Sequence, residues 1–196
     1  MKCISILLLG ILFTGCAKQY VTVYPQMNVN YFRRMAVLPF ASKTDGGSDL
    51  ANGVETNLVN HVPQLDLVER QQIQMITKEW NLVRQGIVSD QTAVNIGRLV
   101  GARVIMTGQI KDCSIIRRGN NGGGVMYGSL RASVRIVDVE TGQLKWAKEF
   151  EITYPGVWGR CQAYFDYTGE SEFKAKMISI ASDSIAKEFY VYEKEM

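Results

Sequence analysis

Side chains that carry out catalysis or bind metals are sparse in this chain of 196 residues. The sequence has one histidine, His61, and nothing near it in the chain supports a catalytic triad. Cysteine and histidine pairs at the spacing of zinc ligands do not occur, and neither does the calcium loop of an EF-hand. We therefore predict no enzyme, no metal and no cofactor, and we interpret His61 as a surface histidine.

Two glycine-containing stretches have some similarity to phosphate-binding loops. The stretch from Gly97 to Ala102 lacks the GxGxxG spacing and precedes an expected strand instead of following one. We interpret Gly97 as a close packing position and Gly101 as a helix C-cap. The stretch Asn120–Gly124 lies between two expected strands, not before a helix, and we interpret it as the tip of a hairpin loop.

The N-terminal residues predict a lipid anchor. Lys2 precedes an apolar run from Ile4 to Phe13, which is shorter than the ~20 residues of a membrane span and has the length found in signal peptides. The following residues resemble the lipobox of bacterial lipoproteins, Leu12-Phe13-Thr14-Gly15-Cys16, with phenylalanine where leucine is usual. The alternative is a short core helix. We expect residues 1–15 to be removed and Cys16 to carry acyl chains such as palmitate.

The position and length of the next segment bear on where the protein acts. By resemblance to enterobacterial sorting rules, Ala17 after the lipidated cysteine suggests the periplasmic face of the outer membrane. Residues 16–32 are expected to form a lipidated tether, and roughly 15 extended residues at ~3.4 Å each span about 50 Å. The remaining residues, 33–196, are expected to form one domain.

After removal of the leader and lipidation of Cys16, two cysteines remain free, Cys113 and Cys161. In an oxidising periplasm they can form a disulfide, or they can be two unrelated thiols. The formal net charge of +3 is too small to suggest a nucleic-acid partner.

Hydrophobic periodicity predicts an α/β fold. Apolar residues recur at helical spacing in four segments, and from about residue 130 they alternate with charged residues, as in a hairpin with one solvated face. The expected order is β-α-β-α-α-β-β-β-α, a mixed sheet with helices packed on it. The expected elements are strand 34–40, helix 48–62, strand 65–69, helix 70–85, helix 90–100, strand 103–112, strand 130–136, strand 144–152 and a helix from 171.

Four stretches of the chain carry a resemblance to a known family. MAVLPF, LDLVERQQIQMI, IGRLVGARVIMTGQI and RIVDVETGQLKW, in this order within residues 34–153, resemble the CsgG-like lipoproteins, the family of the curli-secretion channel. The same fold occurs in penicillin-binding-protein activator lipoproteins and in the amino-terminal domain of TolB. The resemblance implies a non-enzymatic envelope protein that assembles as a ring or binds partner proteins.

The chain departs from a channel protein in the two segments where the channel inserts hairpins. Cys113–Tyr127 and Tyr154–Glu170 are each too short for two membrane-spanning strands and a turn, so we do not expect a pore. The favoured interpretation is an outer-membrane scaffold or ring subunit of an export or surface-assembly system. The alternative is a regulatory lipoprotein that binds a periplasmic enzyme such as a cell-wall synthase. This alternative ranks second because an activator in the outer membrane must reach a synthase across the peptidoglycan. That distance is roughly 100 Å, and a tether of about 50 Å does not span it.

Aromatic residues after the hairpin are candidates for an interface. Such residues are enriched in interface cores, and a homo-oligomer or a contact with other envelope proteins would use them. The alternative is that they cover the sheet edge or touch lipid headgroups. The candidates are Tyr154, Trp158, Tyr164, Phe165 and Tyr167.

Overall fold

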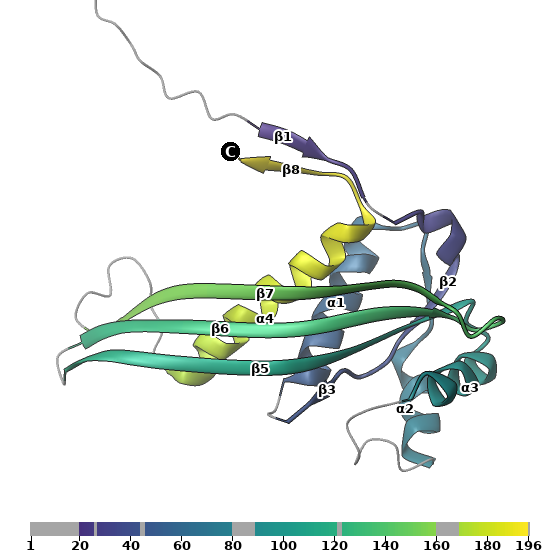
Figure 1. Ribbon diagram of the computed structural model, residues 1–196, viewed down its shortest axis with the longest axis horizontal. Coiled ribbons are helices and arrows are strands. Elements are labelled where there is room, and N and C mark those ends of the chain that lie inside the picture. Colours follow the sequence, from purple (N-terminus) through teal and green to yellow (C-terminus); the bar gives the residue numbers. More distant parts are fainter. Residues whose placement is uncertain are drawn as a thin grey trace, which may run out of the picture.

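Three long antiparallel strands dominate the computed structural model: β5 (Val104–Asn120), β6 (Gly123–Asp138) and β7 (Leu144–Gly159) (Figure 1). The structure describes residues 20–25, 27–43, 46–79, 89–120, 123–159 and 169–195. Alternate residues of β6, from Leu130 to Ile136, are completely buried, as the period of two predicts.

The sheet is mixed, as predicted. Its order is β4-β2-β5-β6-β7, and β2 (Arg34–Val37) runs parallel to both β5 and the short strand β4 (Asp66–Leu67). A further short strand, β3 (Ala41–Ser42), pairs with β5 in parallel. The α/β domain with helices packed on a mixed sheet is therefore confirmed.

Helices cover the two faces of the sheet unequally. α1 (Gly47–His61) and α4 (Glu170–Ala186) lie on one face and share the main core with Met35 and Val37 of β2. α2 (Arg70–Glu79) and α3 (Asp90–Val100) form a smaller core with Ala36 and Leu38, which point to the opposite face. Figure 1 shows α2 and α3 gathered at one end of the long strands, whereas α1 and α4 cross the strands farther along.

The ends of α3 follow the sequence prediction. The Ser89 side chain accepts a hydrogen bond from the Thr92 backbone N–H, which caps the first turn. Gly101 has φ of 67°, the left-handed conformation of a helix C-cap. A Cβ at Gly97 would lie 2.5 Å from Cγ2 of Val139, so this glycine lets α3 approach the sheet. The packing interpretation of both glycines is confirmed.

The long strands extend beyond the predicted ones. β5 continues to Asn120 and β7 to Gly159, and β6 begins at Gly123, inside the stretch interpreted as a loop tip. The expectation of irregular segments there was wrong because glycine breaks the hydrophobic alternation. At Gly128 a Cβ would lie 2.1 Å from the Met177 sulfur, so this glycine makes room for α4.

The segment expected as a tether is partly structured. β1 (Tyr20–Val23) pairs antiparallel with β8 (Tyr192–Glu195), and together they form a separate two-stranded ribbon (Figure 1). Met27 is buried, as is Phe32 at the end of the 3-10 helix η1 (Val29–Phe32). The chain therefore joins the domain well before residue 33.

The C-terminal helix begins slightly earlier than expected. α4 starts at Glu170, so its N-cap is Gly169 and not Ser171. A short 3-10 helix, η3 (Lys187–Phe189), connects α4 to β8. Within the described part of the chain, no helix has the length and apolar character needed to cross a membrane.

Candidate partner-binding surfaces

The structure describes only some of the residues singled out from the sequence. Tyr154 is half-buried, with its ring 5.5 Å from that of Phe173 in α4. Trp158 belongs to β7, but its side chain is not among those described. The residues outside the described ranges are Cys16, Cys161, Tyr164, Phe165 and Tyr167.

Cys113 lies on β5, half-buried beside the small cluster of Met126, Phe173 and Met177. Burial raises the pKa of its thiol. Because Cys161 lies outside the described residues, the disulfide between these cysteines stays a prediction.

His61 is exposed at the last turn of α1, in agreement with its interpretation as a surface histidine. Its ring stacks on that of Tyr190, with centroids 4.5 Å apart. This contact joins α1 to the segment that leads into β8. Among the described residues, no group of histidine, cysteine and carboxylate side chains has the arrangement of a metal site.

The turn between β6 and β7 is organised by the buried carboxylate of Asp138. It accepts hydrogen bonds from the Tyr31 hydroxyl at 2.7 Å and from the Thr141 backbone N–H at 2.8 Å, and the Arg103 guanidinium lies 3.5 Å away. Burial alone would raise the pKa of Asp138, but these hydrogen bonds and the positive charge outweigh it and hold the pKa at about 2. This carboxylate therefore stays ionised and holds the turn together.

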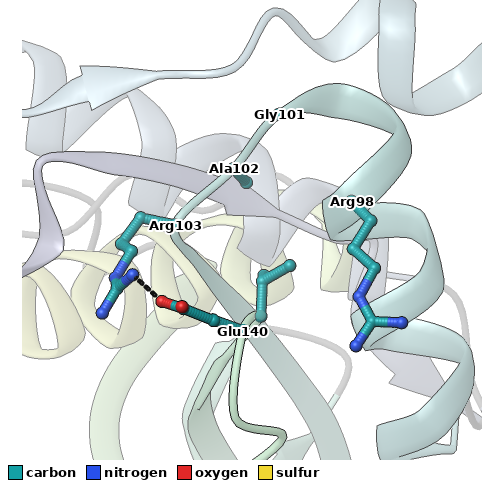
Figure 2. Close-up of a pocket in the computed structure, with 6 residues that line it drawn as sticks. Arg98, Gly101, Ala102, Arg103 and Glu140 are labelled. Carbon is teal, nitrogen blue, oxygen red and sulfur yellow. Dashed lines mark hydrogen bonds and ion pairs between the residues drawn. The ribbon is translucent and has the colours of Figure 1, made fainter.

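A pocket of about 390 Å³ lies next to this turn, between the end of α3 and the start of β5. Figure 2 shows Arg103 and Glu140 facing each other on one side of it, and Arg98 extending from α3 on the other. Arg103 forms an ion pair with Glu140, whereas the described residues supply no carboxylate partner for Arg98. The lining residues are Arg98, Gly101, Ala102, Arg103, Val139 and Glu140.

The pocket supports charge recognition and little else. Its lining offers two guanidinium groups and one carboxylate, and it includes no side chain that is ordinarily a nucleophile. Since Glu140 already neutralises Arg103, the positive charge available to a ligand comes mainly from Arg98. Such a pocket fits a small anionic group better than a protein surface.

A second candidate is the part of the sheet that α2 and α3 leave uncovered. On this face Ile116, Tyr127 and Pro155 stand in one row across β5, β6 and β7. Ile116 is 55% exposed and Tyr127 is 48% exposed. This apolar row lies on the side of the sheet opposite α4, because the intervening residues Ile115 and Met126 pack with the α4 cluster.

Polar side chains occupy the next two rows of the same face. Ser114 and Ser129 are cross-strand partners joined by a hydrogen bond of 2.8 Å, and Thr153 completes their row. We call the nine residues of these three rows the open face. They are Ile116, Tyr127, Pro155, Ser114, Ser129, Thr153, Asp112, Arg131 and Glu151.

Sequence reasoning found part of the open face. The alternation of Arg131 with buried residues predicted a solvated side of the hairpin. The apolar row was missed because its members lie on three strands, and the extension of those strands was not predicted. One feature of the sequence could have indicated this row: Ile116 and Tyr127 lie at a similar distance on either side of the glycine-rich stretch Asn120–Gly124.

Comparison with known proteins supplies the family. The sequence model of "Peptidoglycan-synthase activator LpoB" matches residues 48–152, more than half of the chain. The chain belongs to the LpoB family. The match runs from α1 into β7, so the LpoB region contains the whole pocket and most of the open face. A comparison with curated proteins finds no match.

Several solved structures are similar to this chain at low sequence identity. The C-terminal domain of LpoB from Salmonella enterica is 17% identical with a TM-score of 0.43, and the alignment covers 62% of this chain and 83% of that one. The PelC dodecamer from Paraburkholderia phytofirmans is 15% identical with a TM-score of 0.46, and the alignment covers 87% of this chain and 99% of that one. Lipoprotein GNA1162 from Neisseria meningitidis is 11% identical with a TM-score of 0.46, and the alignment covers 79% of this chain and 98% of that one.

The LpoB match supports one of the relatives named in the sequence analysis, the activator lipoproteins. The narrower resemblance to CsgG-like channel proteins gains no support from these comparisons.

Proposed function

We propose that this chain is a lipid-anchored regulator that binds a peptidoglycan synthase in the periplasm and stimulates it, without catalysing a reaction itself. The observation that carries this proposal is the match of residues 48–152 to the family described as a peptidoglycan-synthase activator. The scaffold or ring subunit favoured from the sequence lacks comparable support, so the regulatory alternative takes its place. Self-association stays a prediction, which sedimentation of the detergent-extracted protein would test.

The open face is the surface that we assign to the synthase. Its apolar row, with Tyr127 at the centre, is bordered on one side by serine, threonine and charged side chains. Protein interfaces are built in this way, with an aromatic or apolar centre and a polar rim. The pocket at Arg98 is less suited to this role, because it is small and half of its positive charge is neutralised within the chain.

The proposal includes the anchor expected from the sequence: removal of residues 1–15, acylation of Cys16 and an outer-membrane location. The strand β1 begins at Tyr20, only four residues after Cys16. Four Cα steps span at most about 15 Å. The domain would therefore stay near the membrane, and the synthase would have to bring its binding surface close to that membrane.

A binding and activity experiment tests the function and the surface separately. A purified synthase from the same organism polymerises its lipid-linked precursor with and without the acylated chain, and affinity is measured on a sensor surface. We expect stimulation by the wild-type chain. Replacing Ile116 and Tyr127 together with serine is expected to weaken binding by about tenfold or more, because central apolar residues carry most of an interface's energy.

The matched control is Val59→Ser on α1, which changes an apolar side chain that is 60% exposed, similar to Ile116 at 55%. Its affinity and stimulation should equal those of the wild type. Loss of binding in both variants, or in neither, would remove the open face as the binding surface. A chain that neither binds nor stimulates any synthase of its organism would refute the regulatory function.

A further inference from the structure

Two adjacent arginines, Arg117 and Arg118, lie near the end of β5 and point to opposite sides of the sheet. Arg117 is the cross-strand partner of Met126, whose side chain packs against α4, so Arg117 lies on the α4 side. Arg118 pairs with Val125 and therefore shares the side of Ile116, two residues earlier. Arg118 thus stands in the row next to the apolar row of the open face.

The two arginines also differ in their partners. Arg117 forms an ion pair with Glu170 at the start of α4, with 3.2 Å between Nη2 and Oε2. Arg118 is exposed, and the described residues supply no carboxylate for it. Within the described part of the chain, the side of the sheet that carries the open face therefore has an uncompensated positive charge at this end.

The opposite end of the open face has the opposite balance of charge. Its last row holds two carboxylates, Asp112 and Glu151, on either side of one guanidinium, Arg131. The row of serine and threonine in between carries no charge. Arg118 lies six residues from Asp112 along β5, which at ~3.3 Å per residue is about 20 Å. The surface is therefore positive at one end, apolar beside that end, and acidic on balance at the other.

A partner that covers the apolar row also affects Arg118. Because Arg118 stands in the next row, a surface that excludes water from Ile116 and Tyr127 removes water from part of this arginine as well. A charged group that loses water without a counter-ion costs free energy, whereas arginine forms strong paired hydrogen bonds with a carboxylate. The complementary surface therefore has an aspartate or glutamate beside the pocket that receives Tyr127.

We propose that Arg118 selects the partner of the open face, and that the partner surface presents a carboxylate to Arg118, an apolar pocket to Tyr127 and a basic group to the acidic end. This order of charges fixes the direction in which the partner lies along the strands, because the reverse direction would bring like charges together. The inference rests on the open face as the synthase-binding surface of the proposed function, and it adds the chemistry and the orientation of the synthase surface.

Replacing the two arginines one at a time tests this inference. The acylated chain binds its purified synthase on a sensor surface as the wild type, as Arg118→Ala and as Arg117→Ala. Both variants lose one arginine from adjacent positions of the same strand, so the side of the sheet is the main difference between them. We expect Arg118→Ala to bind about tenfold more weakly, and Arg117→Ala to stay within about twofold of the wild type. Equal loss in both variants, or loss in neither, overturns the role of Arg118.

Two further measurements separate a paired carboxylate from a general effect of charge. Arg118→Lys keeps the charge but lacks the planar guanidinium, so its affinity should fall between those of the wild type and Arg118→Ala. Raising the salt concentration should weaken the wild type and Arg117→Ala by the same factor, and Arg118→Ala by a smaller factor. If Arg118→Ala depends on salt as steeply as the wild type does, the ion pair with the synthase is wrong.

The outcomes distinguish this inference from the proposed function. If the wild-type chain binds and stimulates the synthase but the two alanine variants behave alike, the function stands and the role of Arg118 is wrong. If the wild type binds no synthase of its organism, the function fails and this inference fails with it. Sedimentation of the detergent-extracted protein covers a second copy of the chain as the partner. A wild-type oligomer that Arg118→Ala dissociates and Arg117→Ala does not would place the carboxylate on that second copy and overturn the synthase as its source.

Discussion

The two ends of the long strands β5, β6 and β7 are covered differently. At one end α1 and α4 pack on one face and α3 packs on the other, so Ile105 and Ile136 are both completely buried. At the far end α4 packs on the sheet through Phe173 and Met177, and no other helix of the described residues covers the opposite face. Stability is therefore concentrated at the closed end, whereas the far end leaves side chains free to contact a partner.

The largest expected effect comes from removing one buried phenylalanine at each end. Phe189 belongs to the main core and Phe173 to the small far-end cluster, and both are completely buried. Either change to alanine should lower the free energy of unfolding by about 3–5 kcal/mol, because the loss of transfer energy is joined by a cavity. Urea denaturation followed by circular dichroism measures this.

Hydrogen exchange tells the two ends apart. Phe189→Ala should speed exchange throughout the sheet. Phe173→Ala should speed it mainly in the far halves of β5, β6 and β7, because that end has its own small cluster. If both variants speed exchange equally everywhere, the sheet unfolds as one unit, and its two ends do not differ in local stability.

The next effect concerns the turn at the closed end. The pKa of the buried Asp138 carboxyl lies at about 2, below its ordinary value of 3.8. Since one pKa unit corresponds to 1.36 kcal/mol, the ionised carboxylate contributes about 2 kcal/mol to stability at neutral pH. Asp138→Asn should lose roughly this amount in denaturant unfolding at pH 7.

The pH dependence gives a sharper check on the same residue. Because the pKa is lower in the folded state, the contribution is complete above about pH 4 and is lost as the pH falls towards 2. The stability difference between wild type and Asp138→Asn should therefore shrink over that range. Tyr31→Phe removes one of the hydrogen bonds and should show a smaller change of the same sign. A difference that does not vary with pH would contradict the assignment.

The closed end was largely predictable from the sequence, and the far end was not. Helix spacing in α1 and α3, the Ser89 cap and the Gly101 C-cap are local signals that the structure confirms. Gly128 shows why the far end was missed. In the sequence a glycine favours a loop, yet Gly128 lies within β6. A glycine is needed there because Met177, far away in sequence, occupies the space where a side chain would be.

The open face and the β1–β8 ribbon were harder to predict because each joins distant segments. The apolar row takes one residue from each of three strands, and their alignment depends on registers set by packing. The ribbon joins Val23 to Tyr192, nearly the full length of the chain apart, with no local pattern to signal it. The lipidation motif predicted at Cys16, in contrast, is a contiguous stretch of sequence, and it stays a prediction because Cys16 lies outside the described residues.

The smallest expected effect comes from two ion pairs of nearly equal length. On the solvated side of the sheet, Lys111 and Glu149 are 2.8 Å apart with side chains 44% and 50% exposed. On the side of α4, Lys148 and Glu188 are 2.7 Å apart with side chains 37% and 13% exposed. Double-mutant cycles with alanine should give a coupling of about 1 kcal/mol for the second pair and no measurable coupling for the first.

The reason is the different exposure of the two carboxylates. Water solvates Glu149 nearly as well as Lys111 does, so removing the lysine leaves no buried charge. One oxygen of Glu188 is buried without a hydrogen-bond partner among the described residues, so loss of Lys148 leaves a poorly solvated carboxylate. Raising the ionic strength should reduce the coupling of the second pair only partly, because partly buried pairs are screened less. Equal coupling for both pairs would mean that the solvated side is less open than its side-chain exposures indicate.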